Sequence, residues 1–113
     1  MSSINVVHLI GNLGNDPELR TSESGTAITN LSVATNETFT DQDGERQQRT
    51  QWHRIVVFGR QAESCVKFLA RGRKVQIEGR LRTRRWIDRD GLERDPTEVV
   101  AHRVTFLDKA KAA

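Results

Sequence analysis

The chain has 113 residues but only one cysteine, two prolines and no tyrosine. Its single thiol, Cys65, excludes an internal disulfide and leaves no cysteine cluster that could hold zinc. The first residues, M-S-S-I-N-V-V-H-L-I-G, contain neither a basic leader nor a long apolar run, so we expect no secretion signal and no membrane span. These absences predict a soluble protein in a reduced, cytoplasmic setting.

Residues that often carry catalysis do not form a known arrangement. His8, His53 and His102 are dispersed without H-x-x-x-H spacing, and the aspartates mostly occupy expected turns. Cys65 lies on the apolar stripe of an expected helix, and the chain has no Walker pattern or other phosphate-binding glycine loop. We therefore expect no enzymatic activity, no metal ion and no cofactor.

Positive charge is concentrated in one part of the chain. Lys and Arg number 18 and Asp and Glu 15, a net charge of only +3, and Arg outnumbers Lys 14 to 4. Residues 71–89 hold eight of the bases and two acids, whereas residues 1–40 hold one base and four acids. Clustered arginines favour a polyanionic partner, because the planar guanidinium group pairs with phosphates and stacks on bases.

The segment Lys74–Trp86 reads K-V-Q-I-E-G-R-L-R-T-R-R-W, and its alternation predicts one strand with two different faces. One face is expected to carry Lys74, Arg80, Arg82, Arg84 and Trp86. The opposite face is expected to turn Val75, Ile77 and Leu81 toward a core. Cations beside an aromatic plate suggest single-stranded nucleic acid, and a solvated strand face is the alternative interpretation.

The remaining elements are read from their hydrophobic periods. Strands are expected at residues 6–13, 27–35, 50–58 and 97–107, with turns at 41–48 and at Asp90-Gly91. Residues 60–71 change to a helical period, and Gly72 stands where a C-terminal cap belongs. The order of three strands, a helix and two strands predicts an all-β, five-stranded OB-fold Greek-key barrel with its helix between the third and fourth strands.

Two of these strands bear on function. In 50–58, Trp52, Arg54 and Phe58 share one face, so aromatic rings and a cation again lie together. Residues 6–13 are apolar on both faces, a pattern typical of a strand buried on both sides. In a small barrel, a partner subunit is the expected cover for the second face.

Several segments together resemble the bacterial-type single-stranded DNA-binding protein, SSB. They are V-H-L-I-G-N-L-G-N-D-P-E-L-R at 7–20, L-S-V-A-T-N-E at 31–37, Q-W-H-R-I-V-V-F-G at 51–59, I-E-G-R-L-R-T-R-R-W at 77–86 and T-E-V-V at 97–100. The resemblance implies sequence-tolerant binding and protection of single-stranded DNA in replication, recombination and repair. It also implies a cytoplasmic, nucleoid-associated protein.

The resemblance assigns roles to individual residues. Bases are expected to stack on Trp52, Phe58, Trp86 and Phe39, the last standing where the family usually has tryptophan. Phosphates are expected to contact Arg54, Arg80, Arg82, Arg84 and Arg85, with Arg60, Arg71 and Lys74 as further candidates. Arg85 breaks the alternation of its strand, so it reaches a phosphate only if a bulge or a strand end redirects it.

Subunit contacts are expected at Val6, His8 and Ile10, and the resemblance adds His53 and Gln76. His53 has an alternative interpretation as a histidine that is hydrogen-bonded within its own domain. The family often has an aromatic residue in place of Gln76, and this departure leaves both a tetramer and a dimer open.

Domain organisation is expected to be simple, with an OB-fold domain at 1–108 and a short stub at 109–113. The acidic C-terminal tail of typical members is not matched by L-D-K-A-K-A-A, so we expect no tail-mediated recruitment of enzymes. A truncated piece and a natural short form both fit this ending. The alternative functions are a dimeric replication-restart (primosome-type) OB module, an enzyme on the same fold, and RNA binding.

Overall fold

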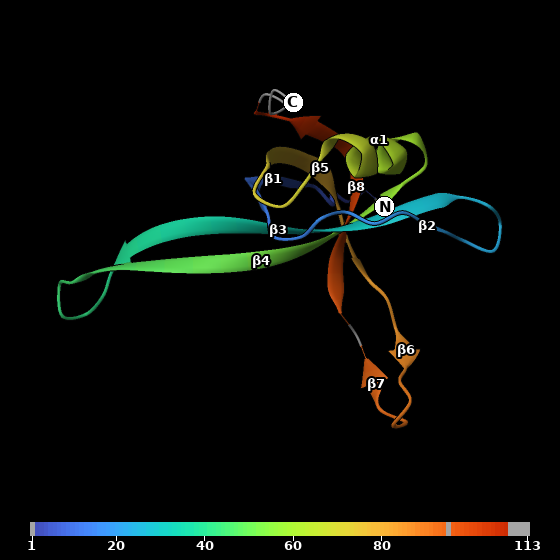
Figure 1. Cartoon of the computed structure of the whole chain (residues 1–113). Helices are drawn as coiled ribbons and strands as arrows, with labels where there is room; N and C mark the ends of the chain where they lie inside the picture. Colours follow the sequence, from blue (N-terminus) through green and yellow to red (C-terminus); the bar gives the residue numbers. More distant parts are fainter. Residues whose placement is uncertain (1, 95, 109–113) are drawn as a thin grey trace.

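Five long strands, with their apolar side chains turned toward one another, form the barrel drawn in Figure 1. This computed structural model describes residues 2–94 and 96–108. The long strands are β1 (Val7–Leu13), β3 (Ala27–Thr40), β4 (Arg46–Phe58), β5 (Lys74–Thr83) and β8 (Thr97–Phe106). The shorter elements are β2 (Arg20–Thr21), β6 (Trp86–Ile87), β7 (Glu93–Arg94) and the helix α1 (Arg60–Phe68).

The strands are hydrogen-bonded in the order β1-β5-β8-β4-β3-β2, and a further pairing between β1 and β3 closes the barrel. β4 and β8 run parallel, and the other neighbouring strands run antiparallel. Among the long strands, α1 lies between the third and the fourth. The predicted OB-fold is therefore confirmed.

The core is built from alternate residues of the long strands, as expected from their period of two. Leu31, Val33, Ile55, Val57 and Ile77 are at most 1% exposed. α1 covers one end of the barrel and adds further apolar side chains, including Ala62 and Cys65. Burial raises the pKa of the Cys65 thiol to about 11, so this thiol stays protonated and unreactive at neutral pH.

The helix is shorter than the sequence suggested. It ends at Phe68, because Leu69 adopts extended backbone and turns its side chain into the core. Gly72 is not the cap. With φ of 93°, it occupies the turn in which the Arg73 amide donates to the carbonyl of Ala70.

A long two-stranded arm projects from the barrel, formed by the outer halves of β3 and β4 (Figure 1). The expected strands stopped at residue 35 and began at residue 50, but pairing continues to Thr40 and Arg46. Cross-strand contacts stabilise this region without a core. Arg49 lies 3.5 Å from Glu37, and the Thr50 hydroxyl donates to Asn36.

The expected strand from Lys74 to Trp86 is wrong at its far end. β5 stops at Thr83, which pairs with Thr97, and the next residue on the β8 side is Pro96, which has no N–H for a continued ladder. Trp86 instead begins β6, which pairs with β7 to form a second arm (Figure 1).

Leu81 is also not a core residue, as its side chain is 48% exposed. β1 begins opposite Gly79 and does not extend as far as Leu81. The side chain of Asn5 takes the place of a strand there and bonds both the N–H and the carbonyl of Leu81. The backbone is satisfied, but nothing from β1 covers the side chain.

No helix in the described part of the chain is long and apolar enough to cross a membrane. The predicted C-terminal stub, residues 109–113, lies outside the described residues.

Candidate nucleic-acid interface

Five predicted site residues lie together on the outer surface of the barrel. Trp52, Arg54 and Phe58 project from β4, on the side opposite the buried Ile55 and Val57. Arg80 and Arg82 project from β5, which is joined to β4 through β8. We call Trp52, Arg54, Phe58, Arg80 and Arg82 the basic-aromatic face. Trp52 is 60% exposed and Phe58 is 37% exposed, so both rings are accessible.

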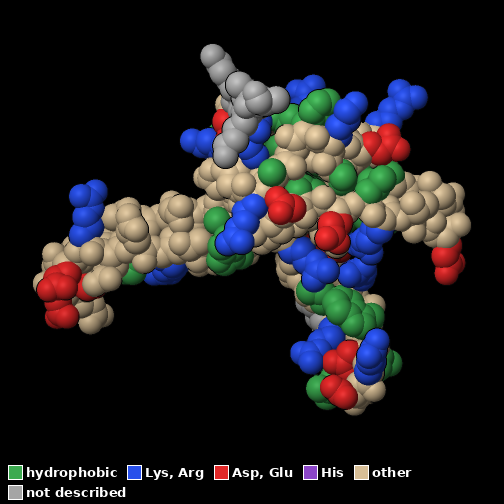
Figure 2. Space-filling view, in the orientation of Figure 1, with side chains coloured by type: hydrophobic (Ala, Val, Ile, Leu, Met, Phe, Trp, Pro, Cys, Tyr) green, Lys and Arg blue, Asp and Glu red, His purple; other side chains and the backbone are tan. Residues whose placement is uncertain are grey.

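Cations surround this face. Figure 2 shows Lys and Arg side chains gathered where the β6–β7 arm leaves the barrel, with a few acidic side chains on the barrel nearby. Arg82 also holds its guanidinium carbon 5.8 Å from the centre of the Phe58 ring, within the range of a cation–π contact. The face thus combines aromatic plates with positive charge.

A carboxylate in the middle of the face was missed by the sequence reasoning. Glu98, on β8, has a side chain with no exposed surface and lies between Arg54 and Arg82. Its Oε1 accepts hydrogen bonds from Nη2 of Arg82 at 2.7 Å and from Nε at 3.2 Å, and its Oε2 lies 3.8 Å from Nε of Arg54. The signal in the sequence is the single acid that precedes the apolar pair Val99 and Val100 in T-E-V-V.

An open hollow of about 350 Å³ adjoins the exposed ring of Trp52. Its lining consists of Asn15, Asn30, Leu31, Ser32, Trp52, His53 and Arg54. Asn15 shapes it, because its amide donates to the carbonyl of Asn30 and accepts from the N–H of Ser32. The hollow offers space for a flat group beside the indole.

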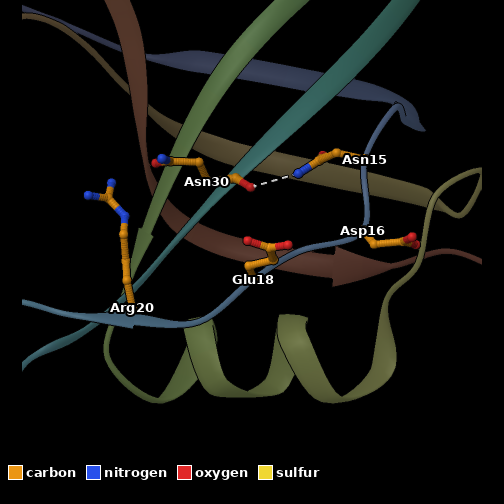
Figure 3. A pocket seen from close by; sticks show the side chains of 5 residues that line it. All are labelled: Asn15, Asp16, Glu18, Arg20 and Asn30. Atoms are coloured by element: carbon orange, nitrogen blue, oxygen red, sulfur yellow. Dashed lines mark hydrogen bonds between the residues drawn. The ribbon is translucent and has the colours of Figure 1, made fainter.

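A second hollow, of about 330 Å³, shares Asn15 and Asn30 with the first. Figure 3 shows the side chain of Glu18 between those of Arg20 and Asp16 along this hollow. Two carboxylates and one guanidinium group give it no net attraction for phosphate. We do not include it in the nucleic-acid interface.

Each arm carries one predicted aromatic residue beside an arginine. On the β3–β4 arm, Arg49 lies over Phe39 with its guanidinium carbon 4.6 Å from the ring centre. On the β6–β7 arm, Arg84 lies over Trp86 at 5.0 Å. Because the arms project in different directions from the barrel (Figure 1), these two aromatic residues lie beyond the basic-aromatic face.

The β6–β7 arm is closed by Asp88. Its carboxylate accepts a hydrogen bond from Nε of Arg94 at 2.8 Å and two more from the amides of Asp90 and Leu92. The Arg94 bond, followed by the Leu92 amide, holds the pKa of Asp88 below its ordinary value of 3.8. The aspartate is therefore charged at neutral pH and supports the turn behind Trp86.

The remaining predicted cations lie outside the basic-aromatic face. Arg85 is exposed in the link between β5 and β6, as expected if a strand end redirects it. Arg60 opens α1, the backbone of Arg71 bonds Asp16, and the backbone of Lys74 bonds Asp108 at the other end of β5.

Four of the five predicted interface residues gather on the outer surface of β1 and β5. His8 pairs with Glu78 and Ile10 with Gln76, and the Gln76 amide nitrogen lies 2.6 Å from Nε2 of His8. Val6 and Ile10 are 73% and 52% exposed, so the chain itself leaves this second apolar face uncovered, and its expected cover by a partner subunit stays a prediction. His53 lies elsewhere, on β4, where its Nε2 is 2.8 Å from the hydroxyl of Thr35.

Comparison with known proteins agrees with this geometry. A model of the single-strand binding protein family matches residues 4–107. The structure of a Plasmodium falciparum SSB complex with ssDNA superimposes with a TM-score of 0.86 at 32% identity, covering 96% of this chain and 98% of that one. A deletion mutant of the single-stranded DNA binding protein from Thermus aquaticus gives 0.82 at 35% identity, covering 93% of this chain but only 51% of that one. The chain belongs to the single-strand binding protein family.

Proposed function

We propose that the chain binds single-stranded DNA with little sequence preference, and that the strand lies on the basic-aromatic face. The observation that carries this proposal is the exposed ring of Trp52 beside Arg54, with Phe58 and Arg82 in contact next to them. Every base has a π-face, so stacking on such rings tolerates any sequence. The related Plasmodium falciparum protein was solved with single-stranded DNA, which supports the same class of ligand here.

The bound DNA strand is proposed to continue from the basic-aromatic face along both arms. Trp86 on the β6–β7 arm and Phe39 on the β3–β4 arm would each receive a further base, with Arg84 and Arg49 beside them. Arg80, Arg84 and Arg85 are exposed and would contact phosphates. A duplex keeps its bases stacked inside and cannot offer them to these rings, so the interface selects single strands.

The proposed activity is binding and protection, with no catalysed step. No cluster of three or more potential metal ligands occurs among residues 2–94 and 96–108. The role in replication, recombination and repair follows from family membership and from coverage of exposed bases.

We also propose that the chain assembles with copies of itself through the outer surface of β1 and β5. Val6 and Ile10 expose apolar surface next to His8 and Gln76, and a second copy would remove this surface from water. Gln76 supplies an amide where the family often has an aromatic ring. The assembly is either a tetramer or a dimer, and a mass measurement distinguishes the two.

The test is a titration of intrinsic tryptophan fluorescence with oligo(dT), oligo(U) and duplex DNA, combined with a mass measurement of the protein. We expect strong quenching by oligo(dT), weak or no quenching by the duplex, and a mass above that of one chain. Equal quenching by oligo(dT) and the duplex would contradict stacking of unpaired bases.

A further inference from the structure

Glu98 places a negative charge at the centre of a surface proposed to bind an anion. The residue is 1% exposed, and its β8 neighbour on the same side, Val100, is 7% exposed. Val100 pairs with Val56 of β4 and with Arg80 of β5. Glu98 lies two residues before Val100 on the same face, so its neighbours across the sheet are Arg54 of β4 and Arg82 of β5. A carboxylate there would repel phosphate unless neighbouring cations compensate it.

The two arginines compensate it unequally. Arg82 donates two hydrogen bonds to Oε1, through Nη2 and Nε, whereas Arg54 approaches Oε2 only to 3.8 Å. Oε2 has no hydrogen-bond partner among the described residues. A buried carboxylate is stable only while its cations stay beside it, so Glu98 restrains Arg82 through two hydrogen bonds and Arg54 through charge attraction alone.

This restraint fixes how Arg82 faces the ligand. Its side chain is bound to Glu98 on one side and lies over the ring of Phe58 on the other. Arg54 and Arg82 alone would carry a charge of +2, and the Glu98 carboxylate lowers the charge of the group to +1. If Arg82 moved onto a phosphate, the Glu98 carboxylate would lose its hydrogen bonds. A buried charge without hydrogen bonds costs free energy, so this movement is unfavourable.

Arg80 and Arg84 differ from this pair. Arg80 is exposed on the same side of β5 as Arg82, and Arg84 lies in the link that follows the strand. Within the described residues neither forms an ion pair with an acid. Their charges are available to a phosphate at no cost to a buried partner.

We propose that Glu98 is a positioning residue that reserves Arg54 and Arg82 for stacking against bases, and leaves phosphate neutralisation to Arg80 and Arg84. The inference rests on the proposed function, since it concerns the division of work within that DNA site. It replaces the expectation that Arg54 and Arg82 contact phosphates. The Arg82 guanidinium, held by Glu98, then lies over the Phe58 ring and offers its outer side to a base.

The test is the dependence of oligo(dT) affinity on salt, measured for the full chain and for substituted chains. Each phosphate neutralised contributes about 0.7 to the slope of log affinity against log salt. Arg80→Gln should make the slope shallower by about 0.7, as expected for the loss of one phosphate contact. Arg82→Gln should weaken binding about tenfold, comparable to the loss of one stacked base, with no change in slope.

Glu98→Gln tests the restraint directly, because the amide can still accept from Arg82 but carries no charge. Released arginines should then bind phosphates, so we expect a slope steeper by about 0.7 to 1.4. Adding Arg82→Gln to Glu98→Gln should now remove about 0.7 of slope, unlike Arg82→Gln alone. Glu63→Gln, on the exposed side of α1, removes one acid elsewhere and should leave the slope unchanged.

Equal slope losses for Arg80→Gln and Arg82→Gln would overturn the proposal, as would a Glu98→Gln chain that folds and keeps the parental slope. If Glu98→Gln or Arg82→Gln does not fold, the comparison of Arg80→Gln with Arg54→Gln still decides between the two accounts, because only Arg80→Gln should make the slope shallower. Failure of the parent chain to bind oligo(dT) would instead remove the proposed function itself. The salt slopes thus separate an error about Glu98 from an error about DNA binding.

Discussion

Gly14 allows the ring of Trp52 to lie directly against the backbone. A Cβ atom on Gly14 would come within 2.7 Å of Cη2 of the indole, and closer still to Cζ3. The φ angle of Gly14 is not positive, so its lack of a side chain is required for this close approach and not for a turn. Gly14 therefore determines where the most exposed aromatic plate of the interface lies.

Gly14→Ala is expected to displace the Trp52 ring while leaving the barrel folded, because the obstructed atoms are the far end of an exposed side chain. In a Trp86→Phe background, where Trp52 is the sole fluorophore of its kind, quenching by oligo(dT) should fall. Affinity should fall by up to about 1 to 3 kcal/mol, the value of one stacked base. In a Trp52→Phe background, Gly14→Ala should leave the quenching of Trp86 by oligo(dT) unaltered. If Gly14→Ala changes the quenching in neither background, the account is contradicted.

Trp86→Ala is expected to weaken oligo(dT) binding by about 1 to 3 kcal/mol, because a stacking plate and its contact with Arg84 are lost together. Equilibrium titration measures this loss. Phe68→Ala is the matched control, since Phe68 is also exposed but packs beside Phe106 and away from the basic-aromatic face. Similar losses for both substitutions would show that the effect is not stacking at Trp86.

The Asp88 carboxyl is expected to titrate below its ordinary value of 3.8, chiefly because of its bond to Arg94. Since the folded pKa is lowered, the stabilisation of the β6–β7 arm is present above the unfolded pKa. It is lost as the pH falls through the folded pKa. NMR titration of the carboxyl carbon should show a low midpoint that rises in Arg94→Gln.

Asp108 provides a control within the same spectrum. Its pKa is also lowered, mainly by a hydrogen bond from Arg73, so its midpoint should stay unchanged in Arg94→Gln. A midpoint of Asp88 that does not respond to Arg94→Gln would mean that the ion pair does not hold the arm.

Ile10→Lys is expected to lower the mass of the assembly, because a charge would be buried where two copies meet. Analytical ultracentrifugation of the parent and the substituted chain measures the change. Leu92→Lys, at an exposed position near the tip of the β6–β7 arm, should leave the mass unaltered. A parent that already sediments as one chain would remove the proposed interface.

The barrel could be predicted from the sequence where side chains meet the core. Leu31 and Val33 in β3 alternate with polar residues because burial on one face imposes a period of two. In β4, Ile55 and Val57 keep the same spacing, although the residue between them is the buried Val56. The same rule gave Trp52, Arg54 and Phe58 a common outer face. The period of two did not predict the outer halves of β3 and β4. Both faces of these segments are exposed to solvent, so burial imposes no pattern on their side chains.

Other features depended on residues far apart in the chain. β5 ends at Thr83 because its neighbour across the sheet approaches Pro96, and Leu81 is exposed because β1 does not reach it. Glu98 meets Arg82 and Arg54 only once three strands lie side by side. A periodic pattern within one segment does not contain such partners.

The central claim is that single-stranded DNA stacks on the tryptophans of this face and of the adjoining arm. The chain has only two tryptophans, Trp52 and Trp86, so an ¹⁵N–¹H spectrum should contain two indole signals that single substitutions assign. Oligo(dT) is predicted to shift both signals in a saturable titration, whereas duplex DNA of the same length leaves them near their free positions. Indole signals that do not move while oligo(dT) binds would contradict the account.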